Sequence, residues 1–204
     1  MLLLSTTVVA SDVTPGKKLV TLLDEISTFK AYFVQKTYIK GNADKTSKGK
    51  MYSKRPNLFR WEVHSPFENL IIADGKNLLD FDKDLEQIIK QSYNANDVTN
   101  TPFFLSGNTD VLLESYNVKI ITEQQADREN RVSFKLTPKG GDLSFEYLIF
   151  SFVDNKMMKL TLHDQLGQTT VISFIKPEVN TELSSKLFKL EIPKGIDVVI
   201  GNFN

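Results

Sequence analysis

Four carboxylates at alternate positions of one short segment are the first residues in this sequence that could do chemistry. They are Asp80, Asp82, Asp84 and Glu86. Clustered carboxylates can bind calcium, and a pair at a suitable separation can hydrolyse a glycosidic bond. Side chains two residues apart on a strand point the same way, however, so this spacing places all four on one strand face or in the turn after it. We interpret them as a solvated face and predict neither activity.

The other residue types used in catalysis form no constellation. His64 and His163 lie in strand-like segments that are remote in sequence, and neither has a nearby carboxylate pattern that suggests a metal or catalytic pair. We expect both at the surface or rim. The sequence contains no G-x-S-x-G elbow, no phosphate-binding loop and no dinucleotide-binding glycine motif, and an esterase would need a Ser–His pair that no local motif supplies. Neither an enzyme nor a metal or other cofactor is predicted.

Cysteine content and charge exclude further classes of protein. Because the 204 residues include no cysteine, disulfide frameworks, thiolate nucleophiles and a cysteine-linked lipid anchor are ruled out. The 25 basic residues balance the 25 acidic ones. The chain therefore lacks the one-signed field that is typical of nucleic-acid and anionic-membrane binders. Composition indicates no electrostatic partner, and nucleic acid is not a predicted partner.

The N-terminus has the character of a targeting segment. Residues 1–10, MLLLSTTVVA, are apolar and are followed by polar SDVTPGKK. This resembles the end of a signal peptide, although its positively charged start is missing, and the segment is too short to span a bilayer. We predict export and a residual signal peptide at 1–10. Residues 11–204 are long enough for one domain with its own core, and no linker or repeat divides them.

Periodicity in the rest of the chain predicts one helix followed by a large sheet. After Thr14-Pro15, leucines at 19, 22 and 23 and Ile26 have the spacing of an amphipathic helix. From Phe29 the period changes to two, and about eleven such segments follow, separated by turn signals such as Asp74-Gly75. Between 91 and 116 the alternation stops, and two short helices are predicted there. The predicted fold is mainly β: a single large antiparallel sheet with a few short helices.

A sheet of this size must curl or pack to cover its apolar face. About three short helices could plug the mouth of a half-closed barrel but could hardly fill its interior, which favours a cavity. The inward faces could equally pack on each other as in a sandwich. The pattern alone leaves both arrangements open.

Five segments in order along the chain resemble one known family. They are KRPNLFRW at 54–61, IIADGKNLLDFDKDLEQI at 71–88, TPFFL at 101–105, LTPK at 136–139 and FKLEIPKGIDV at 188–198. Together they are similar to the periplasmic outer-membrane lipoprotein carrier family, LolA. The resemblance implies an unclosed β-barrel, covered by a helical lid that encloses an apolar cavity, and no catalysis. It also implies a periplasmic monomer whose partners are acylated outer-membrane lipoproteins, an ABC-type lipoprotein-releasing transporter of the inner membrane and an outer-membrane receptor.

The resemblance also assigns roles to particular residues. A wall for acyl chains is expected from eight side chains: Phe59, Trp61, Val63, Leu79, Phe81, Phe134, Phe145 and Tyr147. Phe103, Phe104 and Leu105 are expected to plug the cavity of the empty protein. Arg55 matches the family arginine that fastens the lid, and we expect it to bind backbone carbonyls at 94–106, because a guanidinium offers five donors in a rigid fork.

The absence of cysteine distinguishes this chain from the receptor of the same pathway, and the chain also departs from the family at two places. The receptor of the same pathway shares the fold but is anchored through a cysteine, which is absent here, so a shuttle is expected. The family often has a more aromatic stretch where this chain has Leu79-Asp80-Phe81, which leaves the cargo range open. The family also often has a proline where this chain has Lys83, which leaves the turn at that position open. The main alternative function is a periplasmic regulator that senses lipid or lipoprotein with the same half-barrel.

Overall fold

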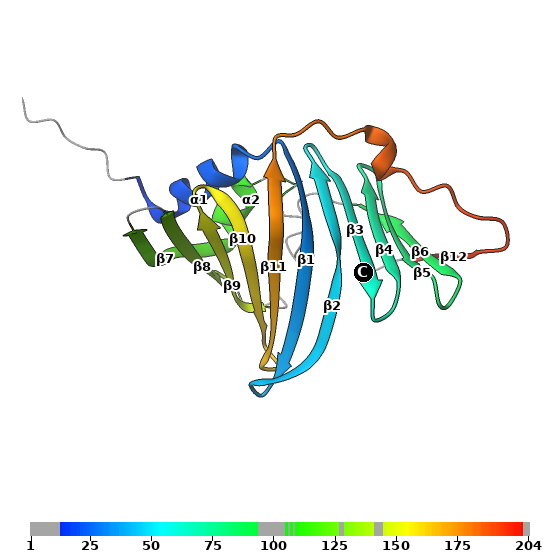
Figure 1. Cartoon of the computed structure of the whole chain (residues 1–204), viewed down its shortest axis with the longest axis horizontal. Coiled ribbons are helices and arrows are strands. Elements are labelled where there is room, and N and C mark those ends of the chain that lie inside the picture. The colour runs from blue at the N-terminus through cyan, green and yellow to red at the C-terminus, as the bar shows by residue number, and fades with distance from the viewer. Residues whose placement is uncertain are drawn as a thin grey trace, which may run out of the picture.

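The computed structural model describes residues 13–93, 105, 107, 109–126, 129–140 and 145–201 (Figure 1). The helices and strands in these ranges are α1 (Pro15–Asp24), β1 (Thr28–Ile39), β2 (Asn42–Lys54), β3 (Leu58–Ser65), β4 (Asn69–Asp74), β5 (Asn77–Asp82), β6 (Gln87–Ser92), α2 (Asp110–Ser115), β7 (Tyr116–Ala126), β8 (Glu129–Pro138), β9 (Phe145–Val153), β10 (Lys156–Asp164), β11 (Gln168–Val179), the short 3₁₀-helix η2 (Ser185–Phe188) and β12 (Asp197–Ile200). Within the described residues no helix is both long and apolar enough to cross a bilayer.

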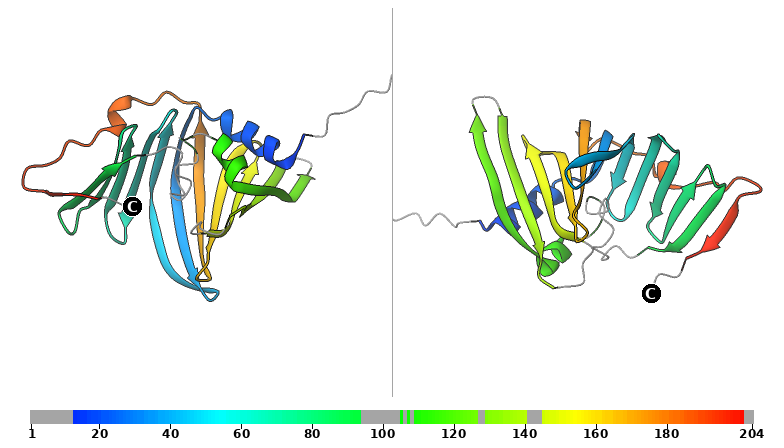
Figure 2. Two further views of the ribbon diagram at one scale, coloured as in Figure 1. Left: turned by 180° about the vertical axis from the view of Figure 1, so that it is seen from behind. Right: turned by 90° about the horizontal axis from the view of Figure 1, so that it is seen from below.

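All the described strands belong to one open sheet. Its order is β12-β6-β5-β4-β3-β2-β1-β11-β10-β9-β8-β7, so β12 and β7 are the two edges. Neighbours are antiparallel except β12, which runs parallel to β6. The predicted single large antiparallel sheet is confirmed, with twelve strands where about eleven were expected. Figure 2 shows the long central strands of this sheet from behind and from below.

The N-terminal helix forms where the sequence predicted it. Thr14 is its N-cap and accepts a hydrogen bond from the backbone N–H of Lys17 at 3.4 Å, and Pro15 occupies the first turn, where its missing N–H is harmless. The side chains of Leu19, Leu22 and Leu23 are buried. Seen from behind in Figure 2, α1 and α2 lie in front of the sheet, and α1 contacts β7.

The two faces of the sheet are covered by different parts of the chain. On the inner face, defined here as the face on which α1 packs, one large apolar cluster joins the helices to most of the strands. Its buried members include Leu19, Leu23, Ile26, Phe33, Met51, Phe59, Trp61, Leu105, Leu112, Phe134, Leu136, Leu148 and Phe150. On the opposite, outer face a smaller cluster of Leu70, Ile72, Leu79, Phe81 and Ile88 is covered by Leu190 and Ile196 of the C-terminal segment.

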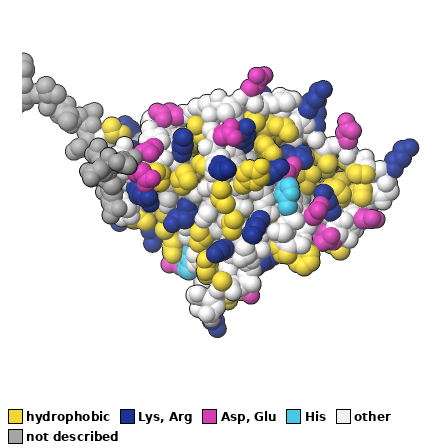
Figure 3. Space-filling model, in the orientation of Figure 1, with side chains coloured by type: hydrophobic (Ala, Val, Ile, Leu, Met, Phe, Trp, Pro, Cys, Tyr) yellow, Lys and Arg dark blue, Asp and Glu magenta, His cyan; other side chains and the backbone are white. Residues whose placement is uncertain are grey.

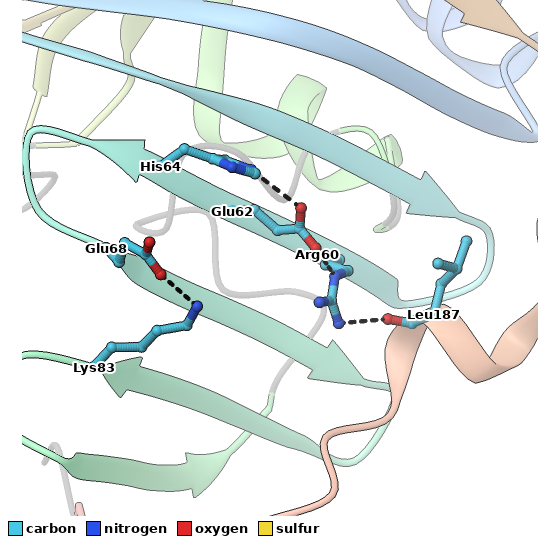
Figure 4. Close-up of polar contacts among 6 residues, drawn as sticks. All are labelled: Arg60, Glu62, His64, Glu68, Lys83 and Leu187. Atoms are coloured by element: carbon cyan, nitrogen blue, oxygen red, sulfur yellow. Dashed lines mark hydrogen bonds and ion pairs between the residues drawn. The ribbon is translucent and has the colours of Figure 1, made fainter.

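Polar contacts hold this C-terminal segment on the outer face. Arg60 donates from Nη1 to the carbonyl oxygen of Leu187 at 3.0 Å and also pairs with Glu62, which in turn contacts His64 (Figure 4). Lys54 donates from Nζ to the carbonyl oxygen of Leu183 at 2.8 Å. The segment therefore docks through both apolar packing and bonds to its backbone.

The side chain of Tyr116, the first residue of β7, is buried. Its side chain is 1% exposed, and its hydroxyl has no hydrogen-bond partner in the part of the chain that the structure describes. Burial raises the pKa of Tyr116 to about 12. The folded protein therefore keeps this proton at pH values where an unfolded chain, with a pKa near about 10, loses it.

Replacing Tyr116 by phenylalanine is expected to stabilise the protein. Removing an unpaired buried hydroxyl should raise the free energy of unfolding at neutral pH by about 1 kcal/mol. Stability of the wild type should also fall as the pH rises from about 10 to about 12, because only the unfolded phenol ionises there, and this loss should be smaller in the variant. Urea denaturation at about pH 7 and about pH 11 measures both effects. Tyr32→Phe, at an exposed position, is the control and should change neither.

Candidate lid latch and apolar face

Arg55 follows the last residue of β2, and its guanidinium binds three backbone carbonyls. Nε donates to Ile26 at 3.1 Å, Nη2 to Leu23 at 3.2 Å and Nη1 to Gly107 at 2.9 Å. The first two carbonyls belong to the end of α1 and the residues after it, and the third lies just before α2. The sequence placed the partners of Arg55 at 94–106; the described partner Gly107 lies one residue beyond that range, and the two from the α1 end were not foreseen.

Asp24 adds a charge to this site that sequence reasoning missed. It is the last residue of α1, where the partial negative charge of the helix end makes a carboxylate unfavourable. Its Oδ1 lies 3.5 Å from Nη1 of Arg55 and accepts a hydrogen bond of 2.6 Å from the hydroxyl of Thr109, the N-cap of α2. One carboxylate thus joins the end of α1, the start of α2 and the turn after β2. The sequence did offer a signal: an acidic residue at the C-terminus of a helix is unfavourable unless a cation or hydrogen-bond donor lies nearby.

The electrostatics of Arg55 reflect this enclosed position. Burial lowers the pKa of Arg55, while the nearby Asp24 opposes that shift. Arginine remains charged at any physiological pH because its ordinary pKa lies far above neutrality. The site therefore holds a permanent cation whose donors are used on backbone oxygens and on one carboxylate. Hydrogen bonds to a charged group are stronger than neutral ones.

Five of the eight predicted wall residues lie in or against the inner cluster, and Phe145 is one of them. Phe59, Trp61 and Phe134 are buried members of that cluster, and Val63 packs against it half-buried. Trp61 stacks on Phe33 with ring centroids 3.7 Å apart and is 5% exposed. The cluster that contains them extends along the sheet from β3 to β8 and includes residues of α1 and α2.

Leu79 and Phe81 lie on the other face, which corrects their predicted place beside Trp61. In the β3–β4–β5 register Phe59 aligns with Ala73 and Leu78, so the even-numbered positions of β5 face inward. Leu79 and Phe81 instead belong to the outer cluster under the C-terminal segment. The error has a physical cause: side chains alternate with a period of two, so a register shift of one residue moves a whole set to the opposite face.

Phe145 and Tyr147 also separate, although both are on β9. The pairing of β9 with β10 shifts between His163 and Asp164, so Phe145 turns inward. Tyr147 points outward, where its ring stacks on His163 with centroids 4.8 Å apart and lies under the Nζ of Lys135. Tyr147 is therefore not part of an inner wall with Trp61, and the irregularity in the strand pairing, which no sequence pattern announced, is the reason.

A pocket opens on the inner face of the central strands. It has a volume of about 200 Å³ and combines apolar with polar side chains. Its lining residues are Gln35, Phe145, Leu162, Asp164, Gln168, Thr170 and Ile172. Apart from Phe145, none of these was predicted, because they come from strands that neighbour one another only in the sheet.

Of the three residues predicted to plug the cavity, the structure describes one. Leu105 is 2% exposed and belongs to the inner cluster. Phe103 and Phe104 lie outside the described residues. Leu105 packs in the same cluster as Trp61 and the helix residue Leu112. It therefore lies where a plug over the inner face would lie.

Comparison with known proteins agrees with this geometry. Residues 24–191 match the family model described as outer membrane lipoprotein carrier protein LolA. An outer-membrane lipoprotein carrier protein of Hahella chejuensis is 37% identical over 180 residues, which cover 87% of this chain and 84% of the relative. One from Chromohalobacter salexigens is 35% identical over 186 residues, covering 90% and 86%.

The solved structures show the same fold at greater distance. An uncharacterised conserved protein from Thermus thermophilus aligns with a TM-score of 0.59 and 12% sequence identity, over 90% of this chain and 99% of that one. At this identity the likeness concerns the fold alone. The family follows from the sequence match, which covers most of the chain at above 30% identity: this protein belongs to the LolA family of outer-membrane lipoprotein carriers.

Proposed function

We propose that this protein, after removal of its leader, is a periplasmic carrier that binds the acyl chains of outer-membrane lipoproteins. It accepts them from an ATP-driven transporter in the inner membrane and delivers them to an outer-membrane receptor, without a catalytic step. The observation that carries the proposal is the large apolar cluster between the inner face of the sheet and its helices. The sensing regulator is not favoured, since the family model and the curated relatives are carriers.

Apolar contact is the interaction that this cargo requires. Transfer of each methylene of an acyl chain from water to apolar surroundings is favourable by a free energy of about 0.8 kcal/mol. The aromatic rings of Phe33, Phe59 and Trp61 offer such surroundings without directional bonds. A surface of this kind holds a chain through area alone, so a receptor with a larger or drier surface can take the chain over.

Loading requires the helices to move. The open pocket of about 200 Å³ is smaller than the range of about 300–1,000 Å³ that is typical of ligand sites. Trp61 is 5% exposed. We therefore propose that acyl chains displace Leu105 and the helices from the inner face and use the apolar surface that this uncovers. Binding of this kind selects a state in which the cluster is open.

Arg55 is the proposed latch against this opening. Its donors connect the end of α1 with Gly107, and Asp24 extends the connection to Thr109. Opening breaks these bonds and exposes the cluster, so the empty protein is biased toward the closed state. Cargo shifts the balance because it binds only the open state.

A release assay tests the proposed function. Spheroplasts that carry a labelled outer-membrane lipoprotein are incubated with the purified protein, and the supernatant is analysed for a complex of the two. We expect release that depends on the amount of protein added, with stoichiometric uptake and no modified product. Release without a complex, or turnover of an acyl ester by the pure protein, would contradict the carrier role.

Phe145 allows a sharper test, because Tyr147 on the same strand provides a matched control. Both rings are half-buried, but Phe145 lines the inner pocket while Tyr147 is on the outer face. Phe145→Ser should weaken lipoprotein binding roughly tenfold through the loss of apolar contact area. Tyr147→Ser should leave binding within about twofold of wild type. Equal effects of the two substitutions would place the acyl chains elsewhere.

A further inference from the structure

The outer face of the sheet is rich in lysines from β2 to β7. Register places the side chains of Lys36, Lys48, Lys50, Lys119, Lys135 and Lys159 on this one face, across β1, β2, β7, β8 and β10. We call these six residues the lysine face. Among the described residues none of the six has a carboxylate within ion-pair distance. They form a field of one sign on this face.

Several acidic side chains near the lysine face are already paired. Glu178 binds Lys30 at 2.9 Å, and Glu129 pairs with Arg131. Glu146 lies 3.4 Å from Nε2 of His163, which offsets its charge only when the imidazole is protonated. At the border with β3, Glu62 pairs with Arg60. Figure 3, which shows the outer face, has Lys and Arg side chains spread over its centre, with most Asp and Glu side chains nearer the margins. A chain with no net charge thus carries a local positive field.

Two exposed apolar side chains lie within the lysine face. Tyr32 is 53% exposed and Ile175 is 45% exposed, and they are direct cross-strand neighbours on β1 and β11. Lys50 lies over the Tyr32 ring, with Nζ 5.5 Å from its centroid. Tyrosine beside lysine is the combination found where proteins meet the headgroup region of a bilayer, since the ring is apolar at its body and polar at its tip.

We propose that the lysine face, with Tyr32 and Ile175, is a weak and reversible docking surface for anionic phospholipid headgroups. Charge complementarity carries the proposal. Lysines at the spacing of neighbouring strands present well-hydrated point charges, which suit a diffuse layer of phosphates, whereas defined carboxylates on a protein partner are better held by arginine forks. The surface lies on the opposite side of the sheet from the acyl-binding cluster, so docking and carrying do not compete.

Vesicle sedimentation tests this without any lipoprotein. Purified protein is mixed with sucrose-loaded vesicles of equal parts phosphatidylglycerol and phosphatidylcholine, and with vesicles of phosphatidylcholine alone. We expect binding only to the anionic vesicles and loss of binding at high salt. A lysine near an anionic surface contributes roughly fivefold to binding, so the exposed triple variant K36Q/K48Q/K159Q should bind at least about tenfold more weakly.

A matched triple variant controls for charge alone. K17Q/K45Q/K194Q also removes three exposed lysines, but none belongs to the lysine face, and it should bind within about twofold of wild type. Equal loss in both triples, equal binding to both vesicles, or binding to poly-glutamate without binding to anionic vesicles would overturn the proposal. Because no cargo is present, these results leave the release assay unaffected, and a failed release assay would leave them unaffected.

Discussion

Arg55→Leu is expected to detach the helices from the sheet without unfolding it. The substitution leaves the carbonyls of Leu23, Ile26 and Gly107 without their donor and the carboxylate of Asp24 without its cation. A lost bond to a charged group costs about 1.5–3 kcal/mol, so the closed state should lose on the order of 3 kcal/mol. Hydrogen exchange should then be faster by roughly a hundredfold in α2 and in peptides that contain Gly107, while the central strands keep their protection.

The functional consequence follows from the same shift. A protein that is already open binds acyl chains without first breaking the latch, so Arg55→Leu should retain lipoprotein more tightly and pass less of it to a receptor. Arg55→Lys keeps the charge but loses the forked guanidinium, so its retention of lipoprotein should be intermediate between that of the wild type and that of Arg55→Leu. Transfer of labelled lipoprotein from the complex to receptor-bearing vesicles measures this.

Arg60 is the matched control for the latch. Its side chain is 20% exposed, against 21% for Arg55, and it also donates to a backbone carbonyl. That carbonyl belongs to Leu187 on the outer face, however, so Arg60→Leu should loosen the C-terminal segment and leave exchange in α2 unchanged. Equal rates of hydrogen exchange in α2 in the wild type, Arg55→Leu and Arg60→Leu would contradict the proposal that Arg55 holds the helices closed.

Among glycine-to-alanine substitutions at the described glycines, Gly49→Ala is expected to destabilise the protein most. A Cβ at Gly49 would lie 1.7 Å from the carbonyl oxygen of Glu62 and 2.7 Å from the ring of Phe33. The oxygen belongs to the neighbouring strand β3, so it cannot move aside without disturbing the β2–β3 pairing. We expect a loss of roughly 3 kcal/mol or more, which corresponds to about 10 °C in Tm for a chain of this length.

The side chain above Gly49 provides a local readout. Phe33 is paired with Gly49 and stacks on Trp61, the only tryptophan. Thermal and urea unfolding followed by tryptophan fluorescence therefore report on this contact directly. Gly140→Ala is the control, because a Cβ there meets no atom within 4 Å, and its Tm should equal that of the wild type. A Tm of Gly49→Ala equal to that of Gly140→Ala would contradict the clash.

Local patterns predicted most of the secondary structure. The helix after Thr14-Pro15 and the hairpin at Asp74-Gly75 formed as expected, because a cap and a turn depend on neighbours in sequence. In the C-terminal segment after η2, only Asp197–Ile200 is a strand. Its apolar residues Leu190 and Ile196 cover the outer cluster, a contact between segments that are far apart in the sequence and that no local pattern predicts.

The site was predicted unevenly for the same reason. A guanidinium beside Pro56 could be recognised as a donor of several bonds, yet its partners Leu23 and Asp24 lie about thirty residues away and were found only in the folded chain. Leu79 and Tyr147 were assigned to the wrong face because register is set by pairing and irregularities between strands, which single-strand periodicity does not contain.

By itself the sequence determined the family, the single large sheet and the absence of any thiol, because these depend on residue types and on periods that can be counted along the chain. Only the tertiary structure decided which face each side chain occupies, how Asp24, Arg55 and Thr109 meet, and that a chain of zero net charge has a lysine face. Composition sums charges over the whole chain, whereas strand pairing sorts them between the two faces of a sheet, and a partner meets one face at a time.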